Sequence, residues 1–181
     1  MGKKNILRMS TMLQAALLST VIVAAVAEAQ EGLYLGAEMV FAGIGGKTNS
    51  GVSLSPGNGG GITGGYGISR NIAVEASFWS TGHDASDGRT IYLQATLLGV
   101  KAVFPLAHSH IEPYVMLGIG KYRLDEIRGE GWLYGAGMDI SLVSSMRLTI
   151  GIARHAVDFG AAPRESEDIT SMSAGISFQF I

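Results

Sequence analysis

Apolar and polar residues alternate one by one through most of this chain, in short segments. In residues 33–41 every odd-numbered position is apolar, and the other face carries Tyr34 and Glu38. Alternation with period two is typical of a β-strand whose two faces meet different surroundings. After residue 29, no continuous apolar run reaches the length of a membrane-spanning helix. The sequence therefore predicts an all-β chain.

Eight such segments are predicted, separated by stretches rich in Gly, Asn, Asp and Ser. They cover residues 33–41, 62–68, 72–78, 90–104, 111–122, 132–140, 147–153 and 171–180. The connections are predicted to be long at 43–58, 81–89, 123–130 and 158–168, and short at 69–71, 105–109 and 142–145. Long loops outside and short turns in the periplasm are typical of outer-membrane barrels. Both termini then lie in the periplasm.

The fourth segment alternates less cleanly than the others. Its apolar phase slips near Leu97 and Leu98, which predicts a β-bulge there. The remaining outer faces consist mainly of Leu, Ile, Val and Phe, as lipid contact requires. In lipid an open sheet edge leaves backbone groups unpaired, so the first and last strands must pair. We therefore expect an eight-stranded antiparallel up-and-down transmembrane β-barrel; a soluble β-sandwich, which needs polar outer faces, is the alternative.

The first residues have the order of a secretory signal peptide. Lys3, Lys4 and Arg8 precede an apolar stretch from residue 12 to 26, and Ala27-Glu28-Ala29 has the form of a cleavage site. The apolar stretch is too short for an uncleaved membrane anchor. No Cys follows it, which argues against a lipoprotein. We predict a cleaved signal peptide at 1–29 and a barrel domain at 30–181.

Composition narrows the possible functions. The chain has no Cys, so it has no disulfide, thiolate metal site or cysteine nucleophile. Its net charge is −2; without residues 1–29, ten basic and fourteen acidic residues remain, a net charge of −4. A basic surface for nucleic acid is not expected. The 26 Gly residues suit a narrow barrel, in which small inward residues fit.

Six charged residues fall on faces that the alternation predicts to point inward. An eight-stranded barrel has just enough interior for side chains, so these charges should pair with one another and fill the lumen. The alternative is a gate or narrow conduit. The six residues are Glu38, Glu75, Lys101, Glu112, Asp139 and Arg147.

Nine acidic residues fall in or near the predicted outer loops. We interpret them as a solvated, mutually repelling surface, with binding of a divalent cation or a basic partner as the alternative. Their spacing matches no EF-hand loop, His83, His108 and His110 show no metal-ligand spacing, and no cofactor is predicted. The acidic residues are Asp84, Asp87, Asp125, Glu126, Glu130, Asp158, Glu165, Glu167 and Asp168.

His155 raises the question of catalysis, because a hydrolase needs a Ser nucleophile with a His as base. Lipid A deacylases, which are also small barrels, carry a His-x-Ser pair near the outer rim. The matching stretch here is His155-Ala156-Val157, so the nucleophile is missing. Ser166 and Ser171 have no predicted position that would replace it. An enzyme using His155 is therefore only a remote alternative.

Several segments resemble the small outer-membrane β-barrel family of OmpA/OmpX-type and opacity-type proteins. They are residues 65–67, 72–75, 98–101 and 113–120, in that order and spacing. Ser173, Gly175, Phe178 and Phe180 resemble, position by position, the C-terminal signal that the barrel-assembly machinery recognises. The departure from that pattern is Ile181 after the last Phe.

The resemblance implies a barrel in the cell outer membrane of a Gram-negative bacterium. Members of the family usually lack enzymatic activity and serve envelope integrity, adhesion or evasion of host defences. The implied partners are outer-membrane lipids, the barrel-assembly machinery and a host or surface ligand held by the loops. A structural or surface-interaction role is the predicted function; the alternative is a minimal, porin-like pore for ions or very small solutes.

Overall fold

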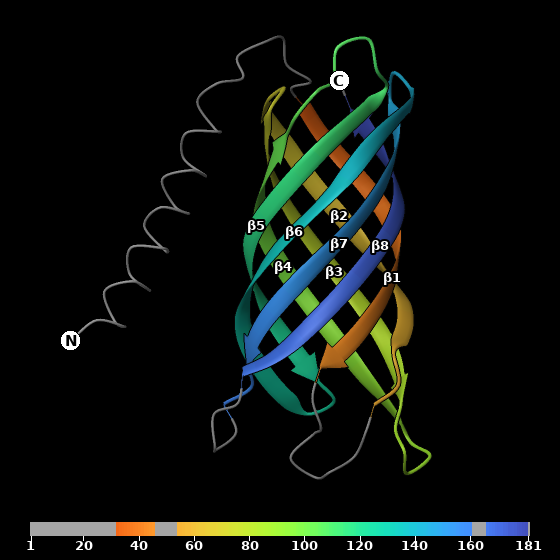
Figure 1. Cartoon of the computed structure of the whole chain (residues 1–181), viewed down its shortest axis with the longest axis vertical. Coiled ribbons are helices and arrows are strands. Elements are labelled where there is room, and N and C mark those ends of the chain that lie inside the picture. The colour runs from red at the N-terminus through yellow and green to blue at the C-terminus, as the bar shows by residue number, and fades with distance from the viewer. Residues whose placement is uncertain (1–31, 46–53, 161–165, 181) are drawn as a thin grey trace, which may run out of the picture.

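The computed structural model describes residues 32–45, 54–160 and 166–180, and these form eight β-strands (Figure 1). The predicted signal peptide and Ile181 lie outside the described residues. The strands are β1 (Gly32–Gly45), β2 (Gly57–Ser69), β3 (Ile72–Asp84), β4 (Thr90–Val103), β5 (Ile111–Leu124), β6 (Ile127–Val143), β7 (Met146–Asp158) and β8 (Ser166–Phe180). No helix among the described residues is long and apolar enough to cross a membrane.

The strands form one closed barrel, in which each is antiparallel to the next and β8 pairs with β1. The predicted eight-stranded antiparallel barrel is thus confirmed, and the β-sandwich alternative is wrong. If the pairing is followed once around the barrel from Leu33, it returns to β1 at Gly43, ten residues further on. With the usual strand spacing and rise, this stagger tilts the strands by about 40°.

The two ends of the barrel differ in their connections. Residues 70–71, 104–110 and 144–145 join strands at one end, which we call the turn end; β1 begins and β8 ends there. At the opposite end, the loop end, β1 ends and β8 begins, and the described residues outside the strands there are 54–56, 85–89, 125–126 and 159–160. In Figure 1 the turn end is at the top.

The predicted alternation of long and short connections is only partly correct. The predicted loop 123–130 is wrong, because β5 runs to Leu124, β6 begins at Ile127, and only Asp125 and Glu126 lie between them. The predicted loop 81–89 is likewise shortened, because β3 continues to Asp84. Conversely, the turn at 104–110 is longer than the loop-end turn at 125–126. The polar residues begin where the outer surface of the barrel stops being apolar. The strands continue to pair beyond that point, so a polar stretch does not mark the end of a strand.

The predicted β-bulge in β4 is also wrong. The register of β4 is unbroken against both β3 and β5, and its residues alternate between buried and exposed from Tyr92 to Lys101. Leu97 points inward and Leu98 outward. The apolar phase slips because the interior changes from apolar to charged along this strand, while the backbone keeps its register.

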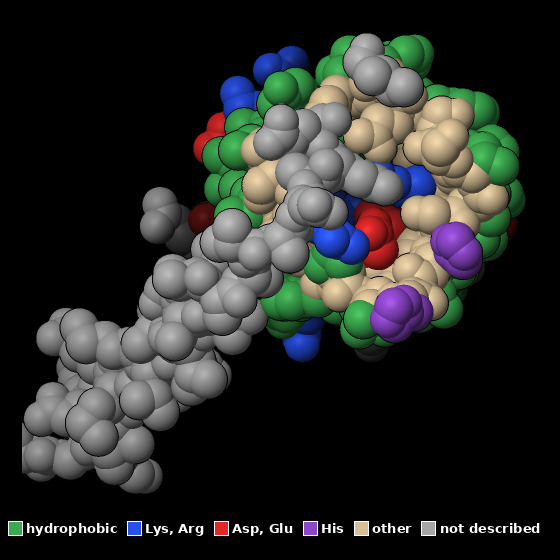
Figure 2. Space-filling model, turned by 90° about the horizontal axis from the view of Figure 1, so that it is seen from above, with side chains coloured by type: hydrophobic (Ala, Val, Ile, Leu, Met, Phe, Trp, Pro, Cys, Tyr) green, Lys and Arg blue, Asp and Glu red, His purple; other side chains and the backbone are tan. Residues whose placement is uncertain are grey.

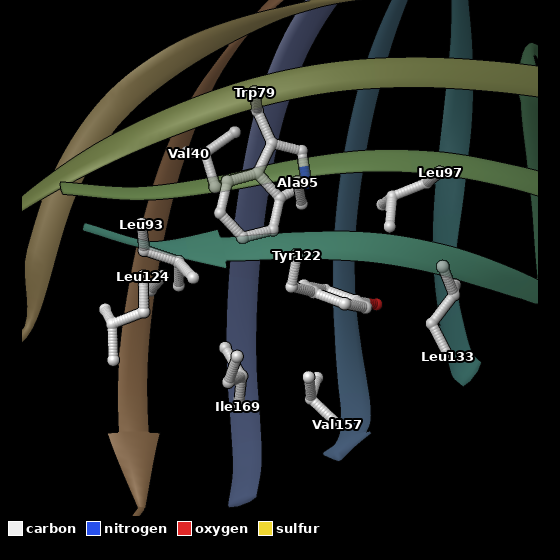
Figure 3. Packing of buried hydrophobic residues seen from close by; sticks show 11 residues of the cluster. Val40, Trp79, Leu93, Ala95, Leu97, Tyr122, Leu124, Leu133, Val157 and Ile169 are labelled. Atoms are coloured by element: carbon white, nitrogen blue, oxygen red, sulfur yellow. The ribbon is translucent and has the colours of Figure 1, made fainter. Parts of the chain in front are cut away.

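The loop-end half of the lumen is filled by apolar side chains, which we call the apolar plug. Leu93, Leu133, Val157 and Ile169 are at most 1% exposed, and Trp79 and Tyr122 lie against them from β3 and β5 (Figure 3). The complete plug consists of Val40, Ala42, Trp79, Leu93, Ala95, Leu97, Tyr122, Leu124, Leu133, Val157 and Ile169.

β2 contributes little side-chain volume to the interior, because most of its inward positions are Gly. A Cβ at Gly61 would lie 2.6 Å from the Cβ of Trp79, and one at Gly65 would overlap the ring of Tyr34. The Tyr34 ring therefore lies directly on the bare backbone of β2 at Gly65, and the Cβ of Trp79 lies against the backbone at Gly61. Such close approach explains why the sequence places Gly at these positions.

The outer surface is apolar around the barrel. Large apolar side chains from every strand are about half exposed, among them Leu35, Ile62, Leu98 and Ile119. Seen from the turn end, green hydrophobic side chains form the perimeter of the ring (Figure 2). Lipid chains would cover this surface, since a soluble monomer rarely exposes a continuous apolar belt.

Candidate functional site

The turn-end half of the lumen is built around Lys101 on β4. Its Nζ lies 2.8 Å from Oδ2 and 3.1 Å from Oδ1 of Asp139 on β6. Glu75 on β3 lies 3.9 Å away on the other side. Lys101 is 5% exposed and Asp139 is 2% exposed, so the pair is largely shielded from bulk solvent. We call Glu75, Lys101 and Asp139 the charged cluster.

Neutral side chains complete the hydrogen bonds of the charged cluster. The Tyr34 hydroxyl donates to Oε2 of Glu75 at 2.8 Å, and the Thr149 hydroxyl donates to Oδ1 of Asp139 at 2.8 Å. The Nζ of Lys101 also lies 4.0 Å from the centre of the Tyr114 ring, a cation–π distance. Buried charges need such additional partners if their loss of hydration is to be offset.

The other three predicted lumen residues also point inward, but they do not join these ion pairs. Glu38 is hydrogen-bonded to Ser173 and lies near Glu75. Arg147 donates to Oε1 of Gln179 at 2.6 Å. Glu112 lies near the turn end, half-buried, and forms no ion pair with any residue that the structure describes.

A cavity of about 90 Å³ follows this polar half of the lumen. Its lining reaches from Arg70 and Glu112 at the turn end to His155 and Ser171 next to the apolar plug. Lys or Arg and acidic side chains are visible in the mouth of the barrel (Figure 2). The cavity has room for a few water molecules.

His155 marks the boundary between the cavity and the apolar plug. Its Nε2 lies 2.8 Å from the Ser171 hydroxyl and its Nδ1 2.9 Å from the Tyr122 hydroxyl. Trp79 packs against the imidazole edge-on, and His155 is only 1% exposed. Sequence reasoning could not place Ser171; the register that pairs β7 with β8 brings it to His155. Ser166, the other Ser considered, lies at the start of β8 and pairs with Asp158.

The other histidines lie in two different settings. His83 is fully buried in β3, although the sequence predicts a loop there. Its Nδ1 lies 3.0 Å from the Ser55 carbonyl, which can only accept, so Nδ1 carries the proton and Nε2 accepts from Thr81. His108 and His110 lie, exposed, in the 104–110 turn. No metal-ligating cluster occurs among the described residues.

The described members of the predicted acidic surface lie at the loop end, but several are neutralised locally. Asp87 forms an ion pair with Arg89 at 2.7 Å, and hydrogen bonds from Arg89 hold the pKa of that carboxyl below its usual value. Asp168 forms an ion pair with Arg154. Asp84 accepts from Thr90 and Asp158 from the Gly160 amide. Glu165 lies outside the described residues, and Glu167 lies within β8.

The residues of the predicted assembly signal divide between the two faces of β8. Ser173 and Gly175 point into the lumen, where a Cβ on Gly175 would meet the Ala37 carbonyl at 2.6 Å. Phe178 and Phe180 face outward and are 52% and 50% exposed. Recognition by the assembly machinery stays a prediction.

A closed antiparallel barrel with an apolar outer surface and a filled, partly charged interior defines a membrane-barrel protein. Residues 13–180 match the family model described as "Outer membrane protein beta-barrel domain". The chain belongs to this family, and its location is the cell outer membrane.

Solved structures show the same fold at low sequence identity. Neisserial surface protein A (NspA) matches with a TM-score of 0.66 and 16% identity, covering 82% of this chain and 97% of that one. OprG from Pseudomonas aeruginosa matches with a TM-score of 0.57 and 13% identity, covering 84% and 98%. Ail, the attachment invasion locus protein of Yersinia pestis, matches with a TM-score of 0.54 and 13% identity, covering 85% of this chain and 100% of that one. No curated protein sequence matches the chain.

Proposed function

We propose that this protein is a non-conducting, non-catalytic outer-membrane barrel with a structural or surface-interaction role. The observation that carries the proposal is the apolar plug. It fills the loop-end half of the lumen, where Leu93 and Ile169 are 0% exposed. The polar cavity on its turn-end side is about 90 Å³ and is lined by residues of the turn end and the middle of the barrel. An ion crossing the barrel would have to enter an apolar layer without its hydration, which is costly.

Single-channel recording in planar bilayers tests this proposal against the porin alternative. We expect no conductance steps from the refolded mature chain. The variant L93A/L133A/I169A removes three plug side chains and is expected to conduct. The matched control L98A/I119A/I176A removes the same kinds of side chain from the outer face and is expected to stay closed. Reproducible steps from the unchanged protein would contradict the proposal and favour a minimal pore.

Folding must be checked in the same preparations. A folded barrel keeps its compact shape in cold detergent, so its mobility on a gel changes when the sample is boiled. We expect this shift for the unchanged protein and both variants. A chain that shows neither the shift nor insertion into lipid would contradict its assignment as a membrane barrel.

The surroundings of His155 and Ser171 argue against catalysis. Both are buried, with Trp79 against the imidazole, and the cavity beside them has no room for a lipid acyl chain. The Nε2 of His155 does meet the Ser171 hydroxyl, but its Nδ1 meets the Tyr122 hydroxyl where a hydrolase would place an orienting carboxylate. We expect no release of fatty acid when the refolded protein is incubated with lipid A and analysed by mass spectrometry. Hydrolysis that disappears in His155→Ala would overturn this part of the proposal.

The surface-interaction role is proposed for the loop end. Ail has been crystallised with the heparin analogue sucrose octasulfate; the likeness to it is one of fold, so the ligand of the present chain has to be sought independently. Cells that display the protein should adhere to host-cell or matrix surfaces more than cells that display a variant with residues 46–56, 85–89 and 159–165 replaced by two-residue Asn-Gly turns. Equal adhesion, with both barrels folded, would leave only the structural role.

A further inference from the structure

The outer face of the barrel changes character near the loop end of β5 and β6. Along β5, the outward residues are Ile119, then Lys121, then Arg123; along β6, towards the same end, they are Trp132, Glu130 and Arg128. Trp is enriched where a membrane meets water. Trp132, which is 55% exposed, therefore marks the loop-end edge of the lipid-facing band, and the charged residues lie just beyond it.

A shallow groove of about 760 Å³ follows this boundary across β4, β5 and β6. It is lined by the basic residues Lys121, Arg123 and Arg128 and by the uncharged polar residues Gln94 and Thr96. Phe78 lies at its β3 side. The groove is on the outside of the barrel. The part of a ligand that extends out of the groove would therefore lie in the lipid or in the water next to it.

The register places Arg123 directly opposite Arg128. Like charges opposite each other on one face of an antiparallel pair repel and destabilise the sheet. The Nε of Arg123 donates to the Asp125 carbonyl oxygen at 2.7 Å. Neither Arg forms an ion pair with another described residue, and neither does Lys121. An anion between the two guanidinium groups would relieve the repulsion.

Two acidic residues border the groove, but they lie away from the Arg pair, so one side of the groove stays basic. Glu130 is the cross-strand neighbour of Lys121, and Asp158, on β7, accepts the Gly160 amide. The Arg pair lies in the row beyond them, further from the lipid-facing band, with Gln94 as its neighbour on β4. This row presents N–H donors and positive charge. Guanidinium groups bind phosphate oxygens in bidentate geometry, which an ammonium group does not match.

We propose that this groove binds the phosphate group of a phosphorylated glycolipid in the outer leaflet of the outer membrane. Arg123 and Arg128 hold the phosphate, and Lys121 contacts it from the side nearer the lipid. The acyl chains lie along the apolar surface that continues from Trp132 and Ile119 toward the turn end. The orientation follows from the rule that the longer connections of outer-membrane barrels are extracellular, which places the loop end in the outer leaflet.

Native mass spectrometry of the refolded mature chain tests the proposal, with bisphosphorylated lipid A as the probe. We expect one tightly bound lipid A, with at least tenfold weaker binding to the variant R123Q/R128Q. The matched control R70Q/R89Q also removes two Arg residues, both outside the groove, and should bind as the unchanged protein does. Unchanged binding to R123Q/R128Q, or an equal loss in the control, would overturn the proposal.

Two further lipids identify the group that is recognised. Lipid A from which both phosphates have been removed keeps the same acyl chains, and we expect it to bind at least tenfold more weakly. Phosphatidylglycerol carries an anionic phosphate on an ordinary phospholipid, and it should also bind more weakly. Equal binding of either lipid would show that the groove does not select a phosphorylated glycolipid.

The variant R128E separates loss of binding from loss of folding. It replaces a like-charge pair by an opposite-charge pair across β5 and β6, so the barrel should be at least as resistant to urea as the unchanged protein. Its binding of lipid A should fall at least tenfold. A folded R128E barrel that binds lipid A normally would contradict the proposal.

Discussion

At the scale of single residues, Lys101 is the side chain on which the charged interior most depends. It is the cation of an ion pair with Asp139 and lies between that residue and Glu75. In a buried site the removal of one partner leaves the other charge without compensation, which costs more than the net contribution of the pair.

The substitution Lys101→Met should therefore lower the free energy of unfolding by about 3–5 kcal/mol. Urea unfolding in detergent micelles, followed by Trp fluorescence, measures this loss. The control Glu112→Gln should change stability by no more than about 0.5 kcal/mol, because Glu112 has no ion pair among the described residues. The double variant K101M/D139N should recover part of the loss. A Lys101→Met barrel as stable as the unchanged one would contradict this account.

Gly65 is the second residue for which the structure predicts a large effect. In Gly65→Ala the new Cβ would overlap the Tyr34 ring, which must move away from its hydrogen bond with Glu75. We expect a loss of about 1–3 kcal/mol, the usual cost of overpacking. Gly64→Ala, on the outer face of the same strand, is the control, because its Cβ would press only on the flexible end of Leu35 and would lie at an ordinary 3.7 Å from the Tyr34 carbonyl oxygen. Equal losses in the two variants would show that the replacement of a strand glycine as such, rather than packing on Tyr34, sets the effect.

Sequence reasoning could identify the six inward charges but not their partners. Alternation gives the face on which a residue lies, and all six do point inward. Which of them meet depends on the stagger between strands, and this brings Lys101 to Asp139, 38 residues away in sequence. The contributions of Tyr34, Thr149 and Ser171 were missed for the same reason. They look like ordinary polar residues on an inward face until the register is known.

At the scale of secondary structure elements, β4 shows how one strand can line both the apolar and the charged half of the lumen. Its inward residues change from Leu93, Ala95 and Leu97 to Gly99 and Lys101, while its outward residues at 98 and 100 are apolar. Sequence alternation assumes one polar and one apolar face for the whole strand, so this change in the inward residues is interpreted as a β-bulge. The lipid outside and the two halves of the lumen inside are three surroundings, and sequence alternation describes only two.

Cysteine labelling tests the phase of β4, because the chain has no Cys of its own. In Leu98→Cys the thiol lies on the outer face and should react with a membrane-permeant maleimide in detergent micelles at alkaline pH, where part of it is ionised to the reactive thiolate. In Leu97→Cys it lies in the apolar plug and should stay unreacted in the folded barrel. After unfolding in urea both should react equally. A folded barrel that is labelled at position 97 and protected at 98 would contradict the observed register.

At the scale of the whole molecule, closure depends on the pairing of the first and last strands. Ala37 on β1 lies opposite Ile176 on β8, and both side chains face outward. Opposite residues of an antiparallel pair have Cα atoms about 4.5–5.5 Å apart, within the range of a disulfide. The sequence predicted this closure correctly, because an open edge in lipid is too costly. It could not predict which residues of β1 and β8 would meet.

The variant A37C/I176C should therefore form a disulfide in the folded barrel under mild oxidation. The cross-linked barrel should keep its β1–β8 seam on boiling and show a smaller change of gel mobility than the reduced form. In A37C/A174C the two positions are diagonal neighbours, about 7–8 Å apart, and should cross-link poorly. Preferential cross-linking of the diagonal pair would show that the seam has a different register.

The glycines of β2 have a consequence for how this strand finds its place. A Gly-rich strand specifies its own alignment weakly, because it presents few side chains to distinguish one register from another. The neighbouring strands supply the missing information, since the Tyr34 ring fits only against a bare backbone at Gly65 and the Cβ of Trp79 leaves no room for a Cβ at Gly61. A slip of two residues that brought Thr63 beneath the Tyr34 ring would place a side chain where no space exists. The register of β2 is thus set by side chains of the neighbouring strands. A substitution in β1 or β3 can therefore shift β2 out of register although the sequence of β2 is unchanged.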